Sequence, residues 1–299
     1  MGPASQIGAE IRTRDAELPP DVAAALAAPA PGSSSTVTAG AIPFHLTSWP
    51  GPGATPLLLL HGVTSNADTW WRMGPALAAA GFSVVAPDMP GHGTTGSWTG
   101  RHRFRETAED VAQLVEVLDL NAAWLAVVGH SWGGMTAAAL PSAGLRPARL
   151  VLLDPPTVPL AWIAAMLDDP VEGSYTNLDE AVRVIGQLHP TWPYRDVIAK
   201  ALGLTQFDEP AVRAILTENG DWDGGLGGLA DPAAEGIPTW LIRGDPAAGG
   251  YVPDDALPRF ASRIGADHII TLPGAPHSPQ RTHPEATVVA LLRALGATS

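Results

Sequence analysis

The amino-acid sequence predicts a doubly wound α/β fold with a mostly parallel central sheet. Three observations carry this prediction: short apolar runs recur along the chain, they alternate with helical patterns, and several of them end at glycine or aspartate. Continuous apolar runs are typical of strands that helices cover on both faces. Because each expected strand is followed by an expected helix, the units are of the βαβ kind and the strands should run parallel.

The first half of the chain contains a hairpin and then alternating strands and helices. Leu57 to Leu60 is an unbroken leucine run, and Phe82 to Ala86 is the next expected strand, which ends at Pro87-Asp88. Arg105 to Leu120 has helical periodicity, with apolar residues on one face. The elements expected before residue 155 are a hairpin at 36–49, strands at 57–60, 82–86, 125–128 and 150–153, and helices at 69–80, 105–120 and 135–140.

The alternation stops after Asp154 and resumes near residue 236. Residues 155–235 hold helical pieces interrupted by Pro and Gly, which is the pattern of an insertion covering the strand ends as a cap. We therefore expect an N-terminal extension, partly flexible, at 1–36, a core at 37–154 and 236–299, and a cap at 155–235. The expected cap helices are 160–167, 178–188, 194–202 and 210–216, and the later core elements are strands at 239–242 and 268–272 and helices at 254–264 and 284–295.

The amino-acid composition limits the kinds of molecule that the protein is expected to bind. The chain has 299 residues, a formal net charge of −13, and no cysteine. An acidic protein is an unlikely partner for nucleic acid and repels polyanions at long range, which favours a neutral or weakly charged small-molecule substrate. The absence of cysteine excludes disulfides and a thiol nucleophile. Lys200 is the only lysine among the 17 basic residues.

No apolar stretch reaches the length of about 18 residues that a spanning helix needs, so we expect no membrane span. The first residues carry acidic side chains before a short apolar piece and do not resemble a secretory signal. We expect a cytoplasmic protein, and the sequence is compatible with a homo-oligomer.

One stretch, LAVVGHSWGG at Leu125 to Gly134, has the features of a nucleophile site. Gly129 to Gly133 fits the pattern G-x-S-x-G, in which a sharp turn from strand to helix raises the serine hydroxyl out of the sheet. Apolar residues precede the motif and an Ala-rich run follows it, as a buried strand and a packed helix require. A Cβ at Gly129 or Gly133 would crowd this turn. Ser131 is therefore the candidate nucleophile.

A serine nucleophile needs a base and a carboxylate, and such groups gather at the carboxyl ends of parallel strands. His277 follows the last expected strand, and Asp245 follows the strand before it. We expect His277 to be the base and Asp245 to be the acid. Asp154 also ends a strand and is the alternative acid.

Other side chains have structural or binding interpretations. His61, Asp88 and His92 lie in strand-end turns and are expected to fix those turns rather than contact substrate. Trp70, Trp162 and Trp192 are candidates for an aromatic substrate pocket, although aromatic residues in a cap also form its own core. No spacing of His and carboxylates suits a metal, and we expect neither metal nor organic cofactor.

These motifs together resemble the α/β-hydrolase superfamily, in its capped serine esterase and lipase-like branch. The similarity rests on the order Ser131, Asp245, His277, on the His61-Gly62 turn, and on the segment from Asp88 to Gly93, and it covers residue 37 to the C-terminus. The resemblance implies a sheet of the eight-stranded type, with the cap inserted after the sixth strand. It also implies an oxyanion hole formed by the backbone N–H groups of Val63 and Trp132.

The implied function is a serine hydrolase that cleaves a carboxylic ester or lactone of a small, mostly apolar substrate through an acyl-enzyme on Ser131. Serine at this position argues against epoxide hydrolases and haloalkane dehalogenases, which resemble this fold but use aspartate there. Three alternatives remain open: a carbon-carbon bond hydrolase, a prolyl-type peptidase, and a small-molecule receptor without hydrolytic activity. The peptidase would favour cap carboxylates near the pocket, for which Glu172, Glu209 and Glu218 are candidates.

Overall fold

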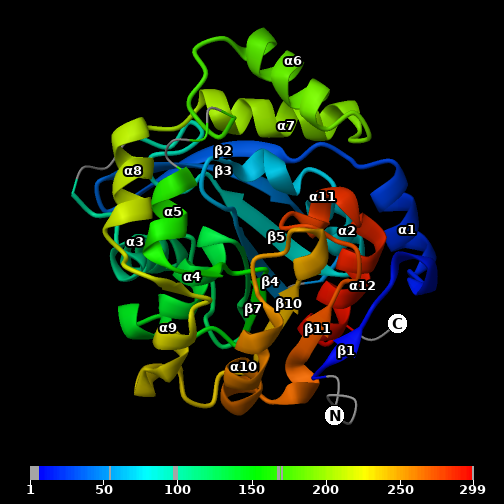
Figure 1. The fold of residues 1–299 in the computed structure, drawn as a ribbon. Coiled ribbons are helices and arrows are strands. Elements are labelled where there is room, and N and C mark those ends of the chain that lie inside the picture. The colour runs from blue at the N-terminus through cyan, green and yellow to red at the C-terminus, as the bar shows by residue number, and fades with distance from the viewer. Residues whose placement is uncertain (1–6, 54, 97–99, 167–168, 170, 298–299) are drawn as a thin grey trace.

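A mostly parallel sheet of nine strands forms the centre of the protein, as the computed structural model shows (Figure 1). The structure describes residues 7–53, 55–96, 100–166, 169 and 171–297. The sheet order is β1-β11-β10-β7-β6-β4-β5-β3-β2, with β2 and β3 antiparallel and the rest of the sheet parallel apart from the β3–β5 pair. The strands are β1 (Ala9–Glu10), β2 (Ser33–Ala39), β3 (Ile42–Trp49), β4 (Thr55–Leu60), β5 (Phe82–Pro87), β6 (Ala126–His130), β7 (Arg149–Leu153), β10 (Thr239–Arg243) and β11 (Ile269–Thr271).

Helices cover both faces of the sheet (Figure 1). One face packs against α1 (Pro20–Ala27), α2 (Met73–Ala79) and α12 (Pro284–Leu295), and the other against α3 (Phe104–Val117), α4 (Trp132–Ala139) and α10 (Leu257–Ile264). The short helix α11 (Pro279–Thr282) precedes α12. The expected α/β class, with its predominantly parallel sheet, is therefore confirmed.

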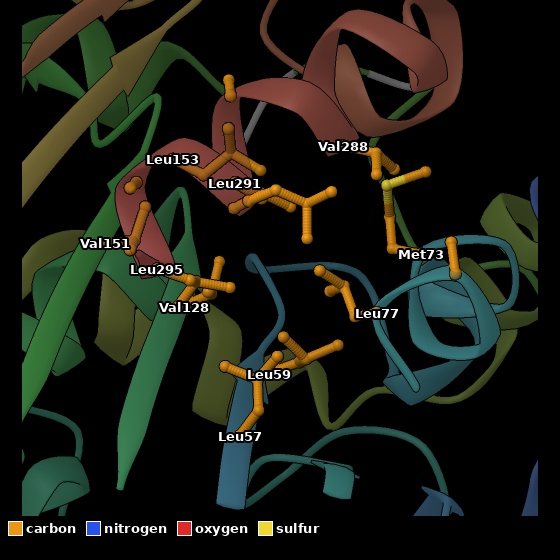
Figure 2. Close-up of a cluster of buried hydrophobic side chains, with 14 of the residues drawn as sticks. Leu57, Leu59, Met73, Leu77, Val128, Val151, Leu153, Val288, Leu291 and Leu295 are labelled. Carbon is orange, nitrogen blue, oxygen red and sulfur yellow. The ribbon is translucent and has the colours of Figure 1, made fainter. Parts of the chain in front are cut away.

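The leucine run of β4 shows why unbroken apolar strands belong at the centre of such a sheet. Leu57 and Leu59 pack with α2 and α12, as Figure 2 shows, whereas Leu58 and Leu60 pack on the opposite face. Successive side chains of a strand point to opposite faces, so burial of both faces requires every residue to be apolar. All four leucines are at most 1% exposed.

The N-terminal residues take part in this core. β1 pairs with β11 at the edge of the sheet, and Val22 and Leu26 of α1 are buried in the cluster that α2 and α12 share. The predicted flexible extension over 1–36 is thus packed onto the fold in its described part, residues 7–36, and residues 1–6 lie outside the described residues. The edge strand β1 also explains why the sheet has nine strands rather than the expected eight.

Between β7 and β10 the chain leaves the sheet and forms mainly helices. This insertion contains α5 (Leu160–Met166), α6 (Leu178–Leu188), α7 (Tyr194–Thr205), α8 (Glu209–Thr217) and α9 (Leu226–Ala230), with a small antiparallel pair of β8 (Thr157–Val158) and β9 (Trp222–Asp223). The last residue of the expected helix 160–167 lies outside the described residues. In Figure 1, α6 and α7 lie together beyond one end of the sheet, away from the two helical layers.

No helix within the described ranges combines the length and the apolar character that crossing a bilayer requires.

Candidate active site

Ser131 occupies a strained turn between β6 and α4. Its backbone has φ 54° and ψ −123°, in a region that L-residues rarely adopt. The glycines on both sides make the turn possible: a Cβ on Gly129 would lie 2.1 Å from the carbonyl oxygen of Gly133, and one on Gly133 would lie 2.4 Å from that of Leu60. The motif therefore holds the serine hydroxyl at the carboxyl end of the sheet.

His277 lies beside this serine. Its Nε2 is 2.9 Å from the Ser131 hydroxyl, and its Nδ1 is 2.7 Å from Oδ2 of Asp154. Since a carboxylate can only accept, Nδ1 carries the proton and donates to Asp154, which leaves Nε2 as the acceptor for the serine hydroxyl. The three side chains thus form a hydrogen-bonded line in the order that general-base activation of a serine requires.

Asp154 is held firmly in this position. Its side chain is fully buried, and its two oxygens accept hydrogen bonds of 2.9 Å from the backbone N–H groups of Gly244 and Tyr251. Both donors belong to the segment after β10, the strand next to β7 in the sheet. Neighbouring strand ends therefore fix the carboxylate that faces the imidazole.

Asp245, the expected acid, does not contact His277. Its carboxylate accepts from the backbone N–H groups of Ala247 and Gly274 at 2.9 Å each, so it caps one turn and ties it to the loop after β11. β10 lies one strand farther from β6 than β7 does. The prediction that Asp245 pairs with the histidine is corrected accordingly: the alternative, Asp154, occupies that place.

Two further side chains position the imidazole of His277. The ring of Tyr251 stacks on it, with centroids 3.8 Å apart and planes inclined by 20°. His130 Nε2 lies 2.7 Å from the carbonyl oxygen of His277 and donates to it. Burial, followed by the neighbouring His277, lowers the pKa of His130 well below its usual value, so this ring stays neutral. Neither role was expected from the sequence.

The residues expected to form an oxyanion hole lie next to the serine. Trp132 begins α4, where the first backbone N–H groups have no partner within the helix, and Val63 follows Gly62, whose Cα faces the side chain of Ser131. Gly62, Val63 and Ser131 border one cavity. Hydrogen bonds between backbone groups also occur outside the helices and strands. Among those of the described residues, none has the backbone N–H of Val63 or Trp132 as its donor.

That cavity has a volume of about 630 Å³ and lies between the strand ends and the inserted helices. Trp162 and Trp192 border it, as the sequence predicts. Trp70 does not: its side chain is fully buried among the residues of α2, α12 and the sheet. The sequence around Trp70 is as typical of a core residue as of a pocket residue, and only the tertiary fold distinguishes the two positions.

The walls of the cavity differ in character. An apolar wall comes mainly from the insertion and consists of Val158, Trp162, Ile163, Met166, Leu216 and Trp222. The polar wall contains Thr64, Ser65, Thr69, Glu172, Lys200 and Arg281. Lys200 and Glu172 form an ion pair of 2.5 Å, and Thr64 donates to the same carboxylate oxygen at 2.8 Å. Lys200 and Arg281 were not expected here from the sequence, because isolated basic residues usually lie on the surface.

The polar residues of the strand-end turns act as expected. Asp88 accepts from the backbone N–H groups of Ala67 and Thr94, and His61 accepts from that of Met89 at 2.9 Å. His92 is buried beside the ring of His61. These side chains fix the turns around the site and do not border the cavity. In the described part of the chain, no group of three or more His, Asp or Glu residues is arranged to hold a metal ion.

Together, the fold and the site define a hydrolase of the α/β class. The model of the alpha/beta hydrolase family matches residues 57–291, and the chain belongs to that family. Two curated relatives illustrate its range. Over 103 residues the chain is 43% identical to the dihydrolipoyllysine-residue acetyltransferase component of the acetoin cleaving system of Pseudomonas putida, a match covering 34% of this chain and 26% of that protein. It is 28% identical to lipase LipV of Mycobacterium tuberculosis, over 76% of this chain and 87% of the lipase.

Solved structures agree on the fold. The crystal structure of E-2-(acetamidomethylene)succinate hydrolase superposes with a TM-score of 0.73, covering 89% of this chain and 99% of that one at 19% identity. At this identity the likeness concerns the fold alone.

Proposed function

We propose that this protein is a serine hydrolase that cleaves a carboxylic ester or lactone through an acyl-enzyme on Ser131. The observation that carries the proposal is the hydrogen-bonded line from Ser131 through His277 to Asp154, at 2.9 and 2.7 Å, bordering a cavity large enough for a small organic substrate. Membership of a family that includes a lipase relative supports the same chemistry.

In the proposed mechanism, the Ser131 hydroxyl attacks the carbonyl carbon while Nε2 of His277 accepts its proton. Asp154 keeps the imidazole in the required tautomer and stabilises the imidazolium that forms. The backbone N–H groups of Val63 and Trp132 donate to the oxyanion. His277 then protonates the leaving alcohol, and in the second half it activates the water that releases the acid and restores Ser131.

The three cap glutamates that a peptidase could use offer no site for a substrate amino group, which favours an ester over a peptide with a free amino terminus. Glu172 borders the cavity, but its carboxylate is paired with Lys200 and hydrogen-bonded to Thr64. Glu209 and Glu218 do not border the cavity. None of these three carboxylates is therefore both unpaired and at the cavity, as binding of a substrate amine would require.

The test is labelling with a fluorophosphonate probe together with turnover of short activated esters such as 4-nitrophenyl butyrate. The native protein is expected to react with the probe at Ser131 and to release 4-nitrophenol, and Ser131→Ala should do neither. If the native protein and Ser131→Ala behave alike in both assays, the proposal is wrong. Tight, non-covalent binding of a small molecule without product would favour the receptor alternative.

A further inference from the structure

Among the described residues that border the cavity, Arg281 is the cationic side chain that forms no ion pair with a carboxylate. The residue is 6% exposed and borders the cavity. Its Nη2 donates to the hydroxyl of Thr69 at 3.0 Å, and its Nε is buried without a hydrogen-bond partner among the described residues. Its guanidinium also lies 5.4 Å from the ring centroid of Trp192. A buried guanidinium with these neutral neighbours retains unused donors.

The carboxylates that influence Arg281 are engaged elsewhere. Glu172 pairs with Lys200 at 2.5 Å, Asp196 with Arg72 at 3.3 Å, and Asp68 with Arg195 at 2.5 Å. Asp169 also borders the cavity, but it is exposed to solvent, which weakens its effect on the interior. Among the described residues that border the cavity, histidines apart, the buried and half-buried ones therefore carry one positive charge in excess.

A second unpaired donor lies on the same wall. Ser65 borders the cavity, and its hydroxyl is buried without a hydrogen-bond partner among the described residues. Ser65 and Thr69 belong to the segment that follows Val63, whereas Arg281 lies just after His277. The polar wall thus contains residues of two segments, the one that carries Val63 of the expected oxyanion hole and the one that carries His277.

From this geometry we propose that Arg281 and Ser65 bind a carboxylate group of the substrate, so that the enzyme acts on an ester or lactone bearing one free carboxylate. This inference rests on the proposed function and refines the substrate from mostly apolar to amphipathic. The guanidinium offers a planar set of donors that matches a carboxylate, and the hydroxyl adds a third donor. The apolar part of the substrate would face the wall formed by residues of the insertion.

The decisive experiment compares two substrates of one length, the mono-4-nitrophenyl ester of adipic acid and its methyl-capped analogue, methyl 4-nitrophenyl adipate. Only the first carries a free carboxylate. For the native protein, kcat/KM should favour the acid, on the order of 10- to 100-fold, as hydrogen bonds to a charged group imply. In Arg281→Gln this ratio should fall to about 1, and Arg281→Lys should retain part of it because the charge remains while the planar donors are lost.

Arg213→Gln is the matched control. It removes one positive charge from the insertion, but Arg213 is an exposed residue of α8 that pairs with Glu209 and does not border the cavity. The ratio should therefore stay within about 2-fold of the native value, because solvent and salt screen exposed charges. A native ratio near 1, or a ratio that Arg281→Gln leaves unaltered, would overturn the inference. Cleavage of the methyl-capped substrate would still show that the protein is an ester hydrolase.

A binding measurement keeps the inference testable if neither ester is cleaved. In Ser131→Ala, monomethyl adipate should raise the midpoint of thermal unfolding and dimethyl adipate should not, and Arg281→Gln introduced into that variant should abolish the difference. If both compounds give the same shift, or neither gives one, the carboxylate site is absent. Native protein and Arg281→Lys repeat the comparison if the double variant does not fold.

Discussion

The aromatic ring of Tyr251 stacks on the imidazole of His277, with ring centroids 3.8 Å apart and planes inclined by 20°. The backbone N–H of the same tyrosine donates to Asp154, the carboxylate that accepts from Nδ1 of that imidazole. Tyr251 therefore fixes both members of the His277–Asp154 pair, with its ring and with its main chain. Its ring also packs edge to face against the ring of Trp162, with centroids 4.9 Å apart, so that aromatic side chains border the cavity beside His277.

We predict that the ring of Tyr251 matters for activity and its hydroxyl does not. Tyr251→Ala should lower kcat on 4-nitrophenyl butyrate about 3- to 10-fold, which is the scale of one aromatic contact, and Tyr251→Phe should stay close to native. Burial, followed by the negative charges of Glu172 and Asp154, raises the pKa of Tyr251 to about 12. The hydroxyl is therefore neutral throughout the assay range, and both variants should keep the native pH profile.

Replacement of the two candidate acids should have very different effects. Asp154→Asn should reduce kcat/KM by about 10⁴-fold, because an amide cannot hold the imidazole in the tautomer that accepts the proton of Ser131. Asp245→Asn should cost a few-fold at most, since its carboxylate caps a turn. Steady-state kinetics on one activated ester, with circular dichroism to check folding, compares them. Equal losses, or a larger loss at Asp245, would contradict the assignment.

The glycines of the turn at Ser131 should be intolerant of a methyl group. Gly129→Ala places a Cβ 2.1 Å from the carbonyl oxygen of Gly133, and relief requires strand and helix to separate, so we expect a loss of about 3 kcal/mol in the free energy of unfolding. Gly186→Ala is the control: this glycine lies within α6, and its Cβ would meet only Val197 at 3.7 Å. It should stabilise by about 0.5–1 kcal/mol. Urea unfolding measures both.

Stability should fall in mild acid because of buried neutral histidines. Burial lowers the pKa of His61 to about 4, and burial together with the neighbouring His61 lowers that of His92 to about 3. The unfolded chain takes up these protons near pH 6.5 and the folded chain does not, so the stabilisation is complete above pH 6.5 and is lost as the pH falls toward 4. Each group contributes up to about 3 kcal/mol over this range.

The measurement is the free energy of urea unfolding at several pH values between 4 and 7. Asp110 opposes the trend, because burial raises its pKa to about 6 and its protonation in acid stabilises the fold. His92→Leu should therefore flatten the slope, whereas His102→Gln, at a more exposed histidine, should leave it nearly native. A slope that His92→Leu does not alter would show that His92 is not responsible.

The elements of the sheet were predictable because local pattern determines them. The runs at 57–60, 82–86, 150–153 and 239–242 correspond to β4, β5, β7 and β10 within one to two residues. Burial between two helical layers favours apolar side chains along such strands, and in β5 the partly buried positions Ser83 and Val85 break the pattern only once. The turn at Ser131 was equally local, because it needs glycine at fixed positions. The edge strand β1 was not predictable, since two residues that pair with β11 carry no apolar pattern.

The partner of His277 depends on contacts that no local pattern records. Asp154 and Asp245 both end buried strands, and the loop after β11 contacts both, through Gly274 at Asp245 and through His277 at Asp154. The choice therefore depends on which carboxylate the imidazole itself reaches in three dimensions. Arg281 was missed for a related reason, because a basic residue between Gln280 and Thr282 has the sequence character of a surface position. Such side chains become recognisable only when the fold encloses them.

The ion pair between Lys200 and Glu172 has a practical consequence for chemical work on this protein. Because Lys200 is the only lysine in the chain, its ammonium group, buried at the wall of the cavity and bonded to Glu172, is the sole side-chain amine. Reagents that modify accessible amines, such as succinimidyl dyes or amine-coupled sensor surfaces, therefore have no exposed lysine to attach to. Slow modification of Lys200 by such a reagent would instead report opening of the cavity, which makes this residue a built-in probe of access to the site.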